Sequence, residues 1–208
     1  MSHYIQYGCG LSAPAGWKNY DASPTLWLRR LPLIGKLIQK VDFPSAVLYG
    51  DIINGLPGIS EKSCDGVFCS HVLEHLSLED FRKALRNTFT ILKQGGIFRC
   101  VLPDLEANIN AYNEEKAAGD PDASLRFLDA TLLGIRNRPN GFKEKIISLL
   151  GNSHHLWMWD KYSMQKELKA VGFSSIRLCR FNDSTDKHFT TVEEENRYYK
   201  AIAFEAIR

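Results

Sequence analysis

The sequence YIQYGCG at residues 4–10 decides the fold of this 208-residue chain. A short apolar run that ends in glycines is typical of a β-strand followed by a sharp turn. Glycine tolerates positive φ at such a turn and lets a ligand approach the main chain closely. A second strand-like run at 17–20 ends at Asp21. A glycine turn after one strand and a carboxylate after the next suit a nucleoside, because the carboxylate can accept hydrogen bonds from ribose hydroxyls.

The composition is that of an ordinary globular domain, with 44% hydrophobic and 24% charged residues. A formal net charge of +2 is too small to indicate a nucleic-acid partner. No signal-peptide pattern is present, and no apolar run reaches the ~20 residues that span a bilayer. The five cysteines never form a C-x-x-C pair, which favours buried, reduced thiols. We therefore expect a cytoplasmic protein, and the oligomeric state stays open.

Further strands and helices alternate along the first half of the chain. Strand-like runs lie at 46–49, 65–70 and 97–102. Ser77 is a favourable N-cap for a helix that we expect to stop at the glycines of 94–96. Strands and helices in alternation predict a mostly parallel sheet covered by helices, with ligands at the carboxyl ends of the strands.

The second half is predicted to be helical before it ends in two strands. Helical patterns lie at 105–117, 122–135, 142–150 and 161–171, and strand-like runs at 174–179 and 199–207. The polar loop that separates the last two strands has no room for a long helix, so we expect them to pair in antiparallel fashion. Near the N-terminus, the basic amphipathic stretch 26–40 leaves peripheral contact with a membrane surface open.

Four motifs in order make residues 4–104 resemble the class I S-adenosylmethionine (SAM)-dependent methyltransferases, in their small methyltransferase-domain form. They are YIQYGCG, Asp21, GDIINGLPGISEKSCDGVFCSHVLEHL at 50–76 and LKQGGIFRCVLPD at 92–104. The resemblance implies a Rossmann-like α/β fold: a seven-stranded, mostly parallel sheet with an antiparallel last strand and helices on both faces. It implies one domain over 1–208, in which 105–160 is a helical insertion that covers the substrate.

The resemblance also implies SAM as cofactor and a set of residues that hold it. These are Gly8, Cys9, Gly10, Asp21, Asp51, Ile52, Ser70 and His71. The glycine turn would line the methionine part, Asp21 would hold the ribose hydroxyls, and Asp51 would face the adenine amino group with Ile52 against the ring. Ser70 and His71 would approach the methyl group.

The expected reaction is methyl transfer from SAM to a small-molecule or carbohydrate-like acceptor (EC 2.1.1.-). An alcohol acceptor needs a base, because an alcohol is a poor nucleophile at neutral pH. His155, His154 and His71 are the candidates, in falling order.

Three alternatives stay open beside this reading. The first is a non-catalytic methyltransferase-like scaffold or partner subunit, favoured by Gln6, where the family usually has an acidic residue, and by a first crossover too short for a helix. The second is a zinc hydrolase, since residues 71–75 spell H-x-x-E-H with Glu74 as base. His71 and His75 should straddle a turn, however, so no metal site is expected. A nicotinamide-dependent oxidoreductase is disfavoured, because Ala13 replaces the last glycine of G-x-G-x-x-G.

Overall fold

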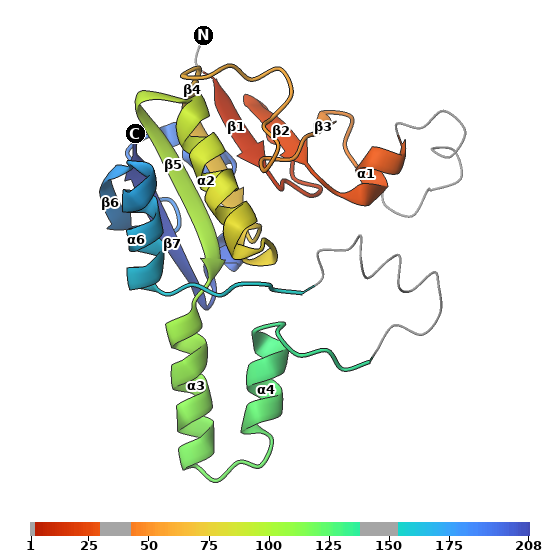
Figure 1. The fold of residues 1–208 in the computed structure, drawn as a ribbon, viewed down its shortest axis with the longest axis vertical. Coiled ribbons are helices and arrows are strands. Elements are labelled where there is room, and N and C mark those ends of the chain that lie inside the picture. The colour runs from red at the N-terminus through yellow and green to blue at the C-terminus, as the bar shows by residue number, and fades with distance from the viewer. Residues whose placement is uncertain (1–2, 30–42, 138–153) are drawn as a thin grey trace.

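The computed structural model describes residues 3–29, 43–137 and 154–208, and within them seven strands form one sheet (Figure 1). The strands are β1 (Tyr4–Tyr7), β2 (Trp17–Asp21), β3 (Val47–Tyr49), β4 (Cys64–Ser70), β5 (Leu92–Pro103), β6 (Ser174–Leu178) and β7 (Ala201–Ile207). Their order is β3-β2-β1-β4-β5-β7-β6. Strand β7 runs antiparallel to both β5 and β6, and the pairs from β3 to β5 are parallel. The predicted Rossmann-like sheet with a reversed last strand is confirmed.

The helices differ from the predicted ones mainly at their ends. They are α1 (Pro24–Arg29), η1 (Leu73–His75), α2 (Leu78–Ile91), α3 (Leu105–Ala117), α4 (Ala123–Ala130), α6 (Lys161–Val171), η2 (Lys187–Thr191) and η3 (Glu195–Tyr198), where η marks a 3-10 helix. Ser77 is the N-cap of α2 as predicted, and its side chain accepts from the backbone N–H of Asp80 at 3.3 Å. The predicted stop at 94–96 is wrong. Helix α2 ends earlier because Leu92 already pairs with Cys64 in the sheet.

The two faces of the sheet are covered by different kinds of structure. Helices α2 and α6 bury Phe81, Leu85 and Met164 in the larger core, together with β5. The described cover of the opposite face consists of the six-residue helix α1, whose Leu26 packs with Val47 of β3, and of 3-10 helices and loops. There Phe189 of η2 packs against Trp17 at a ring-centroid distance of 5.4 Å. Between β6 and β7 the described chain therefore crosses this second face as a polar segment with short 3-10 helices.

The connection from β1 to β2 is a loop, as the short spacing predicted. Gly8 has a φ of +64°, and a Cβ at this position would lie 2.2 Å from Cγ2 of Val72. Only glycine satisfies both the left-handed backbone and this close approach. The turn consequently lets the first residues of the η1 segment lie directly against the end of β1.

The segment 105–160 begins with a helical hairpin beyond the carboxyl end of β5. Figure 1 shows α3 and α4 side by side, projecting away from the sheet. The described helix α4 is shorter than the predicted 122–135, and the predicted helix at 142–150 lies outside the described residues, as does most of the basic stretch 26–40. Among the described residues, no helix is long and apolar enough to cross a membrane. A cytoplasmic location stays a prediction.

Candidate functional site

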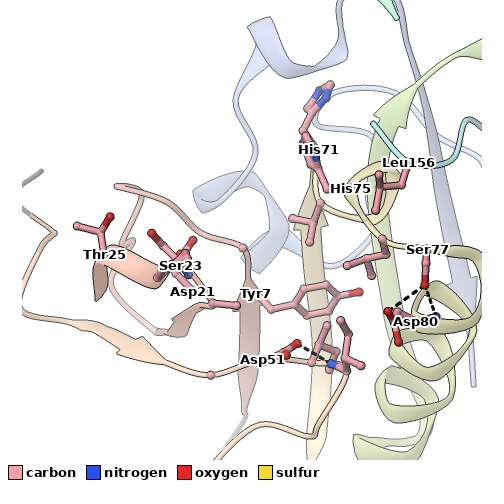
Figure 2. Close-up of a pocket in the computed structure, with 18 residues that line it drawn as sticks. Tyr7, Asp21, Ser23, Thr25, Asp51, His71, His75, Ser77, Asp80 and Leu156 are labelled. Atoms are coloured by element: carbon pink, nitrogen blue, oxygen red, sulfur yellow. Dashed lines mark hydrogen bonds between the residues drawn. The ribbon is translucent and has the colours of Figure 1, made fainter. Parts of the chain in front are cut away.

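A cavity of about 750 Å³ opens at the carboxyl ends of β1, β2, β3 and β4. This is where the strand order reverses direction in the sequence, and such a crevice is the usual ligand site of an open parallel sheet. Five predicted cofactor residues line it: Gly8, Asp21, Asp51, Ile52 and His71. Figure 2 shows Asp21 and Asp51 apart from each other along the hollow, with the Tyr7 ring to the right of both.

Local hydrogen bonds fix both aspartates at the cavity. Asp21 accepts from the N–H of Gly10 at 2.8 Å and from the N–H of Ser23 at 2.7 Å. Asp51 accepts from the N–H of Ile53 at 2.9 Å and from the Asn54 side chain at 2.8 Å. Each carboxylate oxygen keeps lone-pair capacity for a ligand, because an ionised carboxylate offers about four acceptor positions. The two side chains are thus held in place and can still accept further hydrogen bonds.

Three predicted cofactor residues lie beside the cavity instead of lining it. Gly10 contributes its N–H to Asp21. Cys9 is 2% exposed and packs with Leu26, and burial raises the pKa of its thiol to about 12. Ser70 faces a separate small hollow of about 10 Å³ that Gln6 also lines. Gly8 and Cys9 line this small hollow as well, and Gly8 also lines the cavity, so Ser70 lies next to the cavity at the glycine turn.

His71 lies at the cavity in a left-handed backbone conformation, with a φ of 54°. Its Nε2 donates to the carbonyl of Arg197 at 2.8 Å, and its Nδ1 lies 3.3 Å from Oε1 of Glu74. Burial acts to lower the pKa of His71, but the Glu74 carboxylate and the Arg197 carbonyl together raise it. Both ring nitrogens face acceptors of the protein, which favours the protonated imidazole, so His71 is suited to carry positive charge and to shape the cavity, and neither nitrogen is left to act as the base on an acceptor molecule.

The other two predicted catalytic histidines do not line the cavity. His155 is 8% exposed, and its Nε2 lies 4.0 Å from Oε1 of Glu74. Burial lowers the pKa of His155, and His75 adds to that effect while Glu74 opposes it. His154 contributes its backbone carbonyl, which accepts from Nδ1 of His75 at 3.0 Å. These residues form a layer directly behind the cavity wall.

Sequence reasoning missed the part that His75 takes in the cavity wall. His75 lines the cavity and stacks edge-on against His155, with ring centroids 4.9 Å apart. With His71 and Leu156 it forms what we call the histidine end of the cavity (Figure 2). The H-x-x-E-H motif carried the signal. It was interpreted as a zinc-hydrolase motif and as the end of the methyltransferase-like 50–76 motif, whereas the structure groups Glu74 and His75 with His155.

The comparisons agree with this architecture. Residues 31–100 match a family model described as a methyltransferase domain. The chain has the class I methyltransferase fold. A SAM-dependent methyltransferase from Thermotoga maritima, described as a possible histamine N-methyltransferase, superposes with a TM-score of 0.53 at 13% identity, covering 100% of this chain and 82% of that one. A SAM-dependent methyltransferase from Archaeoglobus fulgidus gives 0.51 at 15% identity, covering 100% and 86%.

A third structure of the methyltransferase fold, titled PigF with SAH, gives a TM-score of 0.50 at 13% identity. The superposition covers 99% of this chain and 50% of PigF. No curated protein matches the chain. At these identities the solved structures establish the fold, and the resemblance inferred from YIQYGCG and the 50–76 motif is confirmed at that level.

Proposed function

We propose that the protein transfers a methyl group from SAM to a small-molecule or carbohydrate-like acceptor. The observation that carries the proposal is the presence of Asp21 and Asp51 in one cavity with Gly8, at the ends of three neighbouring strands. A nucleoside needs a carboxylate for its ribose and an acceptor for its adenine amino group. The match of residues 31–100 to a methyltransferase domain supports the same reading.

The cofactor is proposed to lie along the strand ends with its adenosine toward Asp51. Asp21 would accept from the ribose hydroxyls, and Ile52 would pack against the adenine. Near Gly8, Oε1 of Gln6 and Oγ of Ser70 are buried and accept no hydrogen bond from a described residue. A neutral amide oxygen and a hydroxyl are suitable acceptors for the ammonium of the methionine part, so Gln6 can replace the usual acidic residue.

The acceptor is proposed to enter at the histidine end. The sulfonium already makes the methyl group electrophilic, so the protein's task is to align nucleophile, carbon and sulfur and to exclude water. His75 lines this end, whereas His155 and His154 lie behind it. Of the described part of the insertion 105–160, Leu156 lines the cavity, and we propose that this segment selects the acceptor.

Calorimetric titration with SAM and with S-adenosylhomocysteine tests the proposal. The unmodified chain should bind both, and Asp21→Asn should weaken both roughly 10- to 100-fold, as expected for loss of hydrogen bonds to a charged group. Asp120→Asn, on the hairpin between α3 and α4, is the matched control and should leave both affinities unchanged. Absence of binding by either nucleoside would reject the proposal and leave the scaffold alternative.

A further inference from the structure

Glu74 is a buried carboxylate without adequate partners, and it lies behind the histidine end. Its side chain is 1% exposed, and neither carboxylate oxygen accepts a well-aligned hydrogen bond from any residue that the structure describes. Its backbone carbonyl accepts from the N–H groups of Leu156 at 2.7 Å and Trp157 at 3.1 Å, which closes the chain over it. Burying an ionised carboxylate in this way is unfavourable unless a cation lies close to it.

Two imidazoles stand next to this carboxylate. Glu74, His75 and His155 each offer one donor atom, and these three atoms all lie within 4.8 Å of one another. His75 reaches the group from η1, whereas His155 arrives from the far end of the insertion. Two imidazole nitrogens and one carboxylate oxygen form a donor set that zinc and other divalent first-row metals accept.

The hydrogen bonds of His75 leave its Nε2 atom available to bind a metal. The partner of its Nδ1 is the backbone carbonyl of His154, 3.0 Å away. A carbonyl can only accept, so Nδ1 carries the proton and Nε2 keeps its lone pair. Metal-binding histidines are usually oriented by such a bond from the other ring nitrogen. His71, whose Nδ1 lies 3.3 Å from Oε1 of Glu74, orients the carboxylate in a comparable way.

We propose that Glu74, His75 and His155 bind one divalent transition-metal ion, of the zinc type, at the histidine end of the cavity. Zinc–nitrogen bonds of about 2.0–2.1 Å place tetrahedral ligands roughly 3.3 Å apart, so the side chains close by about an ångström on binding. Glu74 is then a ligand and not the base of an H-x-x-E-H hydrolase. His155 replaces His71 as the second imidazole.

Three protein ligands leave coordination positions open toward the cavity that His75 lines. The use of these positions rests on the proposed methyl transfer. A hydroxyl oxygen of the acceptor bound there has a lowered pKa, and its proton leaves to water. The oxygen then forms a bond to the methyl carbon while the carbon–sulfur bond of the sulfonium breaks. The products are the methylated oxygen, neutral S-adenosylhomocysteine and one released proton.

Titration of the chelator-treated full chain with zinc chloride alone, followed by calorimetry, tests the site. We expect one ion per chain. Cobalt(II) should give visible absorption bands of a low-symmetry nitrogen and oxygen site. Glu74→Gln and His155→Gln should each weaken zinc binding by 100-fold or more. His188→Gln is the matched control, since His188 also lies by a carboxylate, 2.9 Å from Asp186, but in an exposed position. It should bind as the unmodified chain does.

Each outcome decides a different point. Absence of saturable zinc and cobalt binding by the unmodified chain overturns the metal site. So does binding that survives in both Glu74→Gln and His155→Gln, since the ion then lies elsewhere. Both variants are first checked for a cooperative unfolding transition and for SAM binding, so that misfolding is recognised. If the unmodified chain binds SAM but does not bind zinc, the metal site alone is rejected. If it binds zinc but does not bind SAM, the proposed function alone is rejected.

Discussion

In the described part of the chain, two buried clusters that each join acidic and basic side chains differ in how completely their hydrogen bonds are satisfied. In one, Arg99 of β5 is fully buried and donates to Glu193 at 2.6 Å, to Glu205 at 2.7 Å and to Asp183 at 3.1 Å. In the other, the carboxylate of Glu74 has no well-aligned donor among the described residues. A buried cluster in which every charged group has a partner within the protein stabilises the fold. A buried cluster with an unpaired charged group is a candidate ligand site.

The Arg99 cluster explains how a polar segment can cover a sheet face without a long helix. Asp183 and Glu193 belong to the connection between β6 and β7, and Glu205 belongs to β7. A fourth bond runs from Nη2 of Arg99 to the carbonyl of Arg180 at 3.0 Å. Burial acts to lower the pKa of Arg99, but the surrounding acidic groups raise it above its ordinary value. The guanidinium therefore stays charged and ties the segment to the sheet.

The largest effect should come from removing the arginine. We expect Arg99→Met to lower the free energy of unfolding by about 3–5 kcal/mol, because it leaves Glu193 and Glu205 buried without their cation. Urea denaturation monitored by circular dichroism measures the loss. Arg177→Met is the control, since Arg177 binds Glu205 and Asp183 but its side chain is 40% exposed. It should cost at most about 1 kcal/mol. Equal losses of unfolding free energy in the two variants would show that the difference in burial does not determine how much each arginine stabilises the protein.

The comparison of the two clusters predicts that replacing Glu74 changes the free energy of unfolding in the opposite direction to replacing Arg99. In the metal-free protein, Glu74→Gln removes a buried charge that lacks good donors, so we expect stability to stay the same or to rise by about 1–3 kcal/mol. The same denaturation experiment, run in the presence of a chelator, measures the change. Adding zinc should stabilise the unmodified chain and leave the variant unaffected. A loss as large as that of Arg99→Met would mean that Glu74 is part of a complete structural ion pair.

The sequence was sufficient to predict those features of the fold and the site that depend on residues close together in the chain. YIQYGCG predicted a strand and its turn, and Asp21 and Asp51 were found because each directly follows a strand whose end the parallel sheet brings to one edge. The ionic clusters were beyond reach because their members meet only in the tertiary structure. Arg99 lies 94 residues from Glu193 and 106 from Glu205. His155 was a candidate from its own surroundings, but nothing near it in the sequence indicates Glu74 as its neighbour.

The helix boundaries show the same division between local and tertiary signals. Ser77 could be identified as an N-cap from its own chemistry, since its hydroxyl needs only the N–H of Asp80 three residues later. The end of α2 depends on a partner strand, because Leu92 pairs with Cys64 of β4. Glycines at 94–96 were therefore a misleading stop signal. They lie within β5, at an irregularity where the pairing with β4 shifts register between Leu92 and Ile97.

The smallest effect should come from an ion pair at the surface, which tests whether burial is the variable that matters. Asp65 accepts from Lys93 at 2.7 Å and from the N–H of His3 at 2.7 Å. Burial acts to raise the pKa of Asp65, but Lys93 and the His3 N–H lower it overall. A carboxyl with a folded-state pKa below its unfolded value of about 3.9 stabilises the fold above that pH. The contribution is lost as the pH falls through the lowered folded-state pKa.

Asp65→Asn should therefore cost about 0.2–1 kcal/mol at pH 7, and the cost should disappear in acid below the folded-state pKa. Urea denaturation across this pH range measures it. In a Lys93→Met background the cost of Asp65→Asn should shrink, because the double-mutant cycle removes the charge partner and leaves the His3 N–H. It should shrink again at high salt, which screens exposed pairs but not the Arg99 cluster. A cost that is independent of pH, of Lys93 and of salt would assign the stabilisation at Asp65 to the backbone hydrogen bond.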